Sequence, residues 1–148
     1  MNALPPPLRD PRKTDADHLK LLALFHFLLA GFALLGIGFL LLHYTLMSSI
    51  MLNPKMFEGQ KGGPPPQEFF ALFQWFYLAF GVLLVIGILG NLLSALWINA
   101  RRYRMFSLVV AAINCFQFPL GTALGVFTIL VLMRESVRDL YEARPESI

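Results

Sequence analysis

The chain has 148 residues, of which 57% are hydrophobic and 14% are charged. Soluble domains carry about a quarter charged residues, so this composition indicates a membrane protein of one domain. The formal net charge is +3, but the 12 Lys and Arg residues are divided among separate polar segments. That division excludes a continuous nucleic-acid-binding surface.

Residues 1–16 hold four prolines among polar residues, which predicts a disordered cytoplasmic tail. A first helix is expected over residues 17–51, with Thr14 or Asp15 as its cap. Its apolar stretch, 21–42, has 22 residues. That is enough to cross a hydrocarbon layer of about 30 Å and longer than the roughly 7–15 residues of a secretory signal core. An uncleaved anchor is therefore favoured over a cleaved signal.

The segment from Asn53 to Gln67 is dense in Gly and Pro, which predicts a loop without regular structure. Its three consecutive prolines suit a stiff spacer, with a partner-binding epitope as the alternative. A second helix is expected over residues 69–100. It ends at the basic segment 101–104, which marks a cytoplasmic interface.

Between Arg104 and Arg134 lies a run of 29 uncharged residues. One straight helix of that length would measure about 43 Å, whereas a hairpin turning at 119–122 gives two shorter helices. These helices are expected over residues 103–118 and 120–142, with 145–148 as a tail. The second one would carry the pairs Arg134 with Asp139 and Glu135 with Arg138 past the membrane.

Charge placement separates the two topologies. The hairpin puts ten basic residues on the cytoplasmic side and two on the other, whereas a single crossing gives seven and five. The first distribution agrees better with the positive-inside rule. The sequence therefore predicts an all-α integral membrane bundle of four transmembrane helices, the last two in a short hairpin, with both termini cytoplasmic.

The predicted spans contain no Asp, Glu, Lys or Arg, which argues against a proton relay or a hydrolytic site. His26 is the one titratable group at depth. His18 and His43 lie about 12 and 25 Å away along the same helix, too far to share a metal ion with it. A neutral imidazole bonded between helices is the favoured interpretation, and no catalytic, cofactor or metal site is expected.

Three amides complete the intramembrane polar candidates: Asn91, Asn114 and Gln117. Such amides usually bond across helices, and a polar pore lining is the alternative.

Small residues mark the expected close helix contacts. Gly90 and Ser94 have the four-residue spacing of one packing face, and Gly121 with Gly125 forms a GxxxG motif directly after the turn. Packing within the bundle is favoured over a dimer contact. Pro119 and Gly121 are expected to form the turn itself.

The segment Ser107 to Leu132 contains Asn114-Cys115, then Pro119, Gly121-Thr122 and the run 124–128, Leu-Gly-Val-Phe-Thr. In these residues it resembles the C-terminal hairpin of a group of small bacterial membrane proteins. The resemblance covers about two thirds of the chain, since the basic end of the second helix and the segment after His18 are similar too. It implies a bacterial inner-membrane protein with four spans and supplies no activity.

The sequence thus predicts a small non-enzymatic membrane protein that acts through protein or lipid contacts, as an oligomer or a complex subunit. A small channel or transporter with an amide-lined path is the alternative. The expected partners are membrane lipid, a second copy or another membrane protein, and not nucleic acid.

Overall fold

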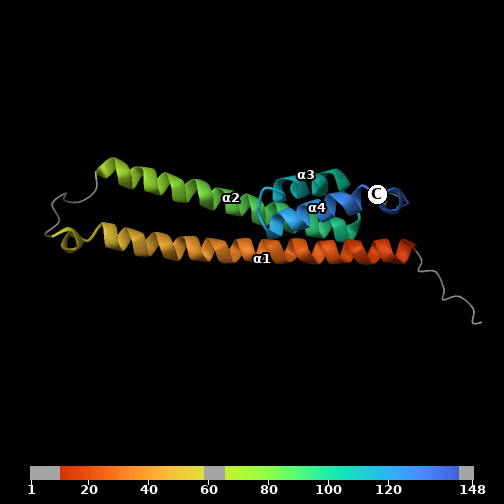
Figure 1. Ribbon diagram of the computed structural model, residues 1–148, viewed down its shortest axis with the longest axis horizontal. Helices are drawn as coiled ribbons and strands as arrows, with labels where there is room; N and C mark the ends of the chain where they lie inside the picture. The colour runs from red at the N-terminus through yellow and green to blue at the C-terminus, as the bar shows by residue number, and fades with distance from the viewer. Residues whose placement is uncertain (1–10, 59–65, 144–148) are drawn as a thin grey trace, which may run out of the picture. The chain divides into compact units, whose positions relative to one another are not determined.

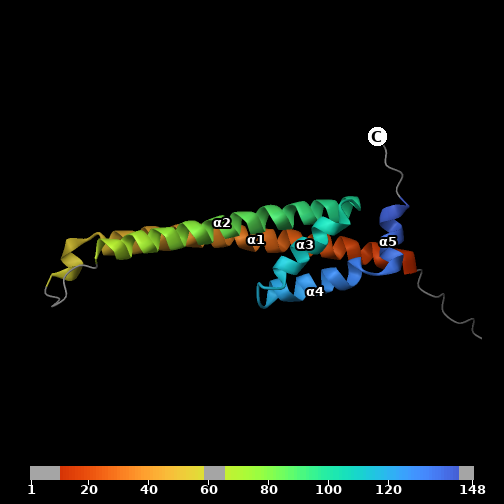
Figure 2. The same ribbon diagram turned by 90° about the horizontal axis from the view of Figure 1, so that it is seen from above.

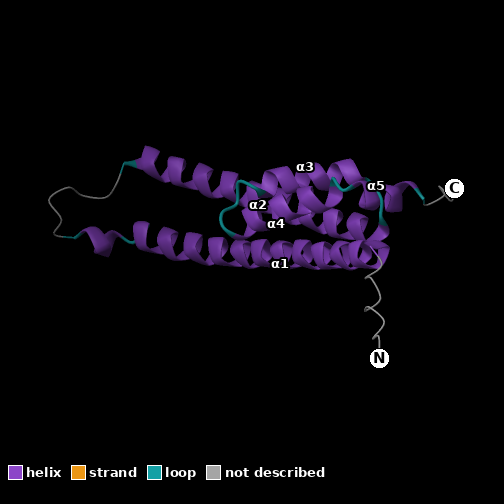
Figure 3. Cartoon of the chain, turned by 45° about the vertical axis from the view of Figure 1, so that its right-hand side comes forward, coloured by secondary structure: helices purple, strands orange, loops and turns teal. Residues whose placement is uncertain are grey.

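The computed structural model describes residues 11–58 and 66–143, and these form helices and loops without a strand (Figures 1 and 3). The elements are α1 Pro11–Met51, the 3-10 helix η1 Pro54–Phe57, α2 Gln67–Ala100, α3 Arg104–Asn114, α4 Leu120–Leu132 and α5 Glu135–Glu142. The predicted all-α class is confirmed. The chain separates into a first unit, Met1–Leu29 with Gly90–Ile148, and a second unit, Ala30–Leu89.

Two helices are long and apolar enough to cross a membrane. The qualifying parts are Lys13–Met51, with 39 residues, and Glu68–Ala100, with 33 residues, each with a mean hydropathy of 2.3 in its best window. A third span results if α4 and α5 are counted together, whereas α3 is a shorter apolar helix. The described chain therefore has the helices of a membrane protein with two to three candidate spans.

The first helix begins earlier than predicted. Residues 11–16 belong to α1, so Thr14 and Asp15 lie within the helix and not at its start. A proline is tolerated in the first turn because the amide it lacks would have no helical partner there. The rest of the predicted tail, 1–10, lies outside the described residues, as does the C-terminal tail 145–148.

The polar loop is also more ordered at its start than predicted. Asn53 caps η1, its side-chain Oδ1 accepting a hydrogen bond from the Lys55 amide at 3.1 Å. Most of the triple proline lies outside the described residues.

The α3–α4 turn lies earlier than predicted. It comprises Cys115 to Pro119, with a cis peptide bond before Pro119, so Gly121 and Thr122 belong to the first turn of α4. The Thr122 hydroxyl donates to the Cys115 carbonyl at 2.8 Å and thereby closes the turn. Beyond it the two helices return side by side (Figure 2).

The predicted continuous fourth helix is wrong, because α4 and α5 meet at an angle of 72° (Figure 2). Arg134 takes an extended conformation between them and bonds to Asp15 instead of Asp139, while Arg138 bonds to Glu142 at 2.7 Å. The bend allows α5 to bury Val137 completely. Burial of an apolar side chain of this size stabilises the fold by about 1.5–3 kcal/mol, which favours the bend over a straight helix.

The first unit has a compact apolar core near the ends of its helices. Four elements contribute the buried side chains Leu19, Leu22, Ala23, Ile98, Val131, Leu132 and Val137. Next to this core the Arg104 Nε donates to the Leu132 carbonyl at 2.7 Å, which satisfies a group left open where α4 ends.

The helix α2 ends in a turn of the Schellman type. The Arg102 amide donates to the Trp97 carbonyl at 2.8 Å and the Arg101 amide to the Ile98 carbonyl at 3.1 Å. This places Arg101 in the left-handed region with φ of 52°, where glycine is the usual residue.

Replacing Arg101 with glycine should raise the free energy of unfolding by about 1 kcal/mol, because the left-handed conformation costs a side chain about that much. The change is measured by denaturant titration in detergent micelles. Arg101→Ala removes the same charge but keeps a Cβ, so its stability should stay within about 0.5 kcal/mol of the original. Equal stabilisation by both variants would show that charge, not backbone strain, decides the effect.

Candidate functional site

Four polar side chains from four helices meet inside the first unit. His26 on α1, Asn91 on α2, Asn114 on α3 and Thr128 on α4 are each at most 2% exposed. The imidazole Nδ1 lies 2.8 Å from Asn91 Oδ1, and Nε2 lies 3.3 Å from Thr128 Oγ1. The two amides bond to each other, at 2.8 Å and 3.3 Å. We call these four residues the polar clamp.

The bonding pattern defines the protonation of the imidazole. Asn91 Oδ1 accepts from Asn114 Nδ2, and because an amide oxygen cannot donate, His26 Nδ1 must carry a proton to bond to the same atom. In the neutral ring Nε2 is then the acceptor, and the Thr128 hydroxyl donates to it. All four side chains of the clamp are therefore uncharged, and each one is hydrogen-bonded to another member.

The structure brings together three of the four intramembrane polar candidates. Gln117 stays outside the clamp, because α3 ends at Asn114 and the amide of Gln117 lies exposed in the turn. Thr128 belongs to the clamp although sequence reasoning passed over it. The available signal was its position on the face of α4 that also carries Gly121 and Gly125, all of them buried.

The glycines of the GxxxG motif face α3 within the same chain. A Cβ built on Gly125 would lie 2.4 Å from the Ala111 carbonyl oxygen and 2.7 Å from Cys115 Sγ. One built on Gly121 would lie 2.7 Å from the Asn114 carbonyl oxygen. These close approaches bring α3 and α4 near enough for Asn114 and Thr128 to reach the other members of the clamp.

Of the other predicted small residues, Gly90 lies against α3. Gly90 faces Val110, with 3.6 Å between the position of a Cβ and Val110 Cγ2. Ser94 is fully buried, as is Ser107 on α3. Neither hydroxyl has a hydrogen-bond partner among the described residues. Pro119 is exposed at the end of the turn.

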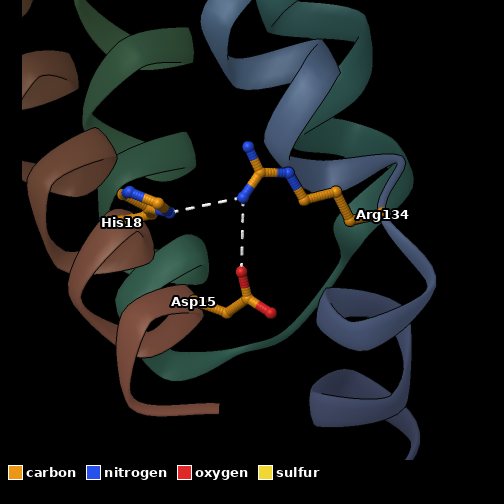
Figure 4. A network of polar contacts seen from close by, with 3 residues as sticks. All are labelled: Asp15, His18 and Arg134. Carbon is orange, nitrogen blue, oxygen red and sulfur yellow. Dashed lines mark hydrogen bonds and ion pairs between the residues drawn. The ribbon is translucent and has the colours of Figure 1, made fainter. Parts of the chain in front are cut away.

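A charged group joins the start of α1 to the residue between α4 and α5 (Figure 4). Arg134 Nη1 donates to Asp15 Oδ1 and to His18 Nδ1, both at 3.4 Å. Asp15 is 5% exposed, so the guanidinium compensates a carboxylate that is largely removed from water. His18 also contacts the ring of Phe127 edge-on. This group holds α1 to the end of α4 and has the composition of a structural ion pair.

The phenol of Tyr141 lies against the core on α5, outside the candidate long spans. Burial raises the pKa of Tyr141 to about 12, against a smaller lowering by the charges of Arg104 and Arg101. Its hydroxyl has no hydrogen-bond partner among the described residues. The folded chain therefore favours the neutral, protonated phenol over the phenolate.

Because the pKa of Tyr141 is higher in the folded chain than the ordinary value of about 10, the folded state retains a proton that the unfolded state loses. Stability is thus complete below pH 10 and should fall between pH 10 and 12. In Tyr141→Phe the free energy of unfolding should fall by about 1–2 kcal/mol less than in the original protein between pH 7 and pH 11. At pH 7 the two proteins should be nearly equally stable. Unfolding curves of both proteins at pH 7 and pH 11 test this, and parallel pH profiles would contradict it.

The second unit has its own polar pair, within the hairpin of α1 and α2. His43 Nδ1 is hydrogen-bonded to the Tyr77 hydroxyl, and the two rings are stacked with centroids 5.9 Å apart. Tyr44 and Phe73 pack on the same phenol. Such amphipathic rings are typical of a membrane interface.

The clamp contains no charged group, and its only hydroxyl, that of Thr128, is fully buried, so its chemistry is that of a neutral hydrogen-bonded contact between helices. Within residues 11–58 and 66–143, no three His, Cys, Asp or Glu side chains gather where they would hold a metal ion. The chain matches no protein-family model, and no curated protein or solved structure is significantly similar to it. Fold and site together define the class of this protein: a helical chain with two to three membrane-competent helices and a buried polar clamp.

Proposed function

We propose that this protein is a small non-enzymatic integral membrane protein that acts through contacts with protein or lipid, as an oligomer or a subunit of a larger complex. The observation that carries the proposal is the polar clamp. Its imidazole and amides satisfy one another inside the first unit, while the surfaces of the helices are apolar, with Leu35 and Phe39 about 70% exposed. Side chains engaged in this way stabilise a fold, and the exposed apolar surface remains for partners.

The test is the size of the protein in membranes. Chemical crosslinking in native membranes, followed by purification in mild detergent, should give an assembly clearly larger than the 16.7 kDa chain. A particle containing one chain and no stoichiometric membrane protein would count against this function. The alternative of an amide-lined channel predicts ion or solute flux in liposomes that Asn114→Leu abolishes.

The proposal includes a topology with both termini in the cytoplasm, at the bacterial inner membrane that the sequence resemblance implies. Four segments enter the membrane, and the last two do so only partly. At 11 and 13 residues, α3 and α4 measure about 16 and 20 Å, less than the roughly 30 Å of hydrocarbon. A hairpin of this length enters and leaves on the same side.

The clamp supports a half-depth hairpin. Asn114, at the end of α3, bonds to Asn91, which also bonds to His26. His26 lies five residues, or about 8 Å, into the apolar stretch that begins at Leu21. The α3–α4 turn follows Asn114 directly, so in this topology it lies between this level and the middle of the bilayer, which is about 15 Å deep. The exposed rings of Phe116 and Phe118 at the turn suit contact with acyl chains.

The native Cys115 in this turn, the single cysteine of the chain, tests the depth directly. With a membrane-impermeant thiol reagent, Cys115 should remain unlabelled from either side. Ser49→Cys in a Cys115→Ala background is the positive control, since it lies near the far end of α1 and is exposed. Labelling of Cys115 from the far side alone would establish four complete crossings instead.

A further inference from the structure

A groove of about 740 Å³ runs along the hairpin of α1 and α2 within the second unit. The α1 wall contains Ile37 and Leu40, and the α2 wall contains Leu78, Val82 and Ile86. Among the described residues from 31 to 89, none is fully buried. The two helices therefore leave an apolar channel along their shared face that their own side chains do not fill.

The small residue Gly81 keeps this groove open. A Cβ on Gly81 would meet only Leu40 Cδ2, at 3.6 Å. This is an ordinary contact distance, so a side chain at Gly81 would fit without moving the backbone. It would occupy the space that the groove now provides.

The groove is polar at one end and apolar at the other. Tyr44, Gln74, Trp75 and Tyr77 lie at the end near the loop between α1 and α2, and the aliphatic residues lie beyond them. Tyr and Trp rings of this kind belong at headgroup level. From Gln74 to Ile86 the groove extends 12 residues along α2, or about 18 Å. That length is close to the roughly 15 Å of one leaflet's hydrocarbon.

The polarity and the length of the groove limit what can occupy it. Its polar end lies near the α1–α2 loop, and its aliphatic walls extend for about the depth of one leaflet. A flexible apolar chain with a polar end matches both features.

We infer that this groove binds one phospholipid of the leaflet near the α1–α2 loop, with an acyl chain along Gly81 and its ester or phosphate oxygens at Tyr44 and Gln74. The Tyr44 hydroxyl and the Gln74 amide donate to these oxygens. This inference rests on the proposed function, which includes contact with lipid. It adds where the lipid binds and that the lipid is a phospholipid.

The test uses the full chain reconstituted in vesicles of mixed phosphatidylethanolamine and phosphatidylglycerol, extracted in mild detergent and weighed by native mass spectrometry. The original protein should retain one phospholipid per chain. Gly81→Leu should lower that fraction roughly tenfold, the result of about 1.4 kcal/mol of lost contact. Val82→Phe fills the same groove from a neighbouring position and should act likewise.

Gly38→Leu is the matched control. It adds the same side chain to α1 at a glycine whose Cβ would meet nothing within 4 Å and which does not line the groove. It should retain lipid like the original protein, and circular dichroism with thermal melting identifies any variant that fails to fold. Tyr44→Phe combined with Gln74→Leu should weaken retention without altering the helices.

Two outcomes would overturn the inference: an original protein that retains no lipid, or equal retention in Gly81→Leu and Gly38→Leu. A dimer that Gly81→Leu separates while lipid retention is unchanged would assign the groove to a second copy instead. The same spectra report the mass of the assembly. Loss of the lipid site with the assembly intact would therefore leave the proposed function standing.

Discussion

Replacing Asn91 with leucine is expected to lower the free energy of unfolding by about 2–4 kcal/mol. The substitution keeps the volume but leaves His26 Nδ1–H without an acceptor and the Asn114 amide without both of its bonds. Each buried polar group left without a partner costs about 1–3 kcal/mol, and a bond between helices in lipid contributes about 1 kcal/mol. Reversible unfolding in mixed micelles measures the loss.

Gln117→Leu is the control for this prediction, since it exchanges the same chemical groups at an exposed position of the turn. Its stability should change by less than about 0.5 kcal/mol. A double-mutant cycle between positions 91 and 114 should give a coupling energy of about 1 kcal/mol or more, because the two amides bond to each other. Additive losses would mean that the clamp does not act as a unit.

Replacing Gly125 with alanine is expected to lower the free energy of unfolding by about 2–3 kcal/mol, since one added methyl group would overlap the α3 backbone. The Ala111 carbonyl oxygen lies 2.4 Å from the position of the new Cβ, and a backbone atom cannot rotate away. The two helices must separate. The Asn114 and Thr128 contacts of the clamp then lengthen as well, which thermal melting in detergent detects.

At Gly31 an alanine is expected to raise the free energy of unfolding instead of lowering it, because a Cβ there would meet nothing within 4 Å. Gly31→Ala should raise stability by about 0.5–1 kcal/mol, because alanine is the better helix former. If Gly125→Ala were as stable as Gly31→Ala, the close approach of α3 and α4 would be refuted. The size of the assembly should change in neither variant if the motif packs only within the chain.

Much of the secondary structure was readable in the sequence because long uncharged runs admit few alternatives. The predicted ends of the first two helices, at 51 and 100, agree with α1 and α2. The errors lie where local signals were weak. The prolines of residues 1–16 predict a disordered tail, yet Pro11 begins a helix whose Asp15 is bonded to Arg134, 119 residues further along the chain. No local pattern contains that contact.

The same limit applies to the site. His26, Asn91 and Asn114 were candidates because polar groups at depth require partners, but the sequence does not say which groups meet. The polarity of Thr128 does not by itself require a partner on another helix, since a threonine can satisfy its hydroxyl within its own helix. Only its position on the face with Gly121 and Gly125 points to the clamp. Gln117 carries the same amide group as Asn114. The two differ in the structure because α3 ends at residue 114, which leaves Gln117 in the turn and outside the clamp.

By itself the sequence determined that this chain is helical, that it has the long apolar helices of a membrane protein, and that its basic residues gather beside the uncharged runs. These properties follow from composition and from charge placed along the chain. The tertiary structure alone decided the bend between α4 and α5, the position of the turn, and the meeting of His26, Asn91, Asn114 and Thr128. The meeting of these four side chains depends on the close approach of the α3 and α4 backbones at Gly121 and Gly125. The bend depends on the burial of Val137. Both involve residues that are far apart along the chain, so no local pattern contains them.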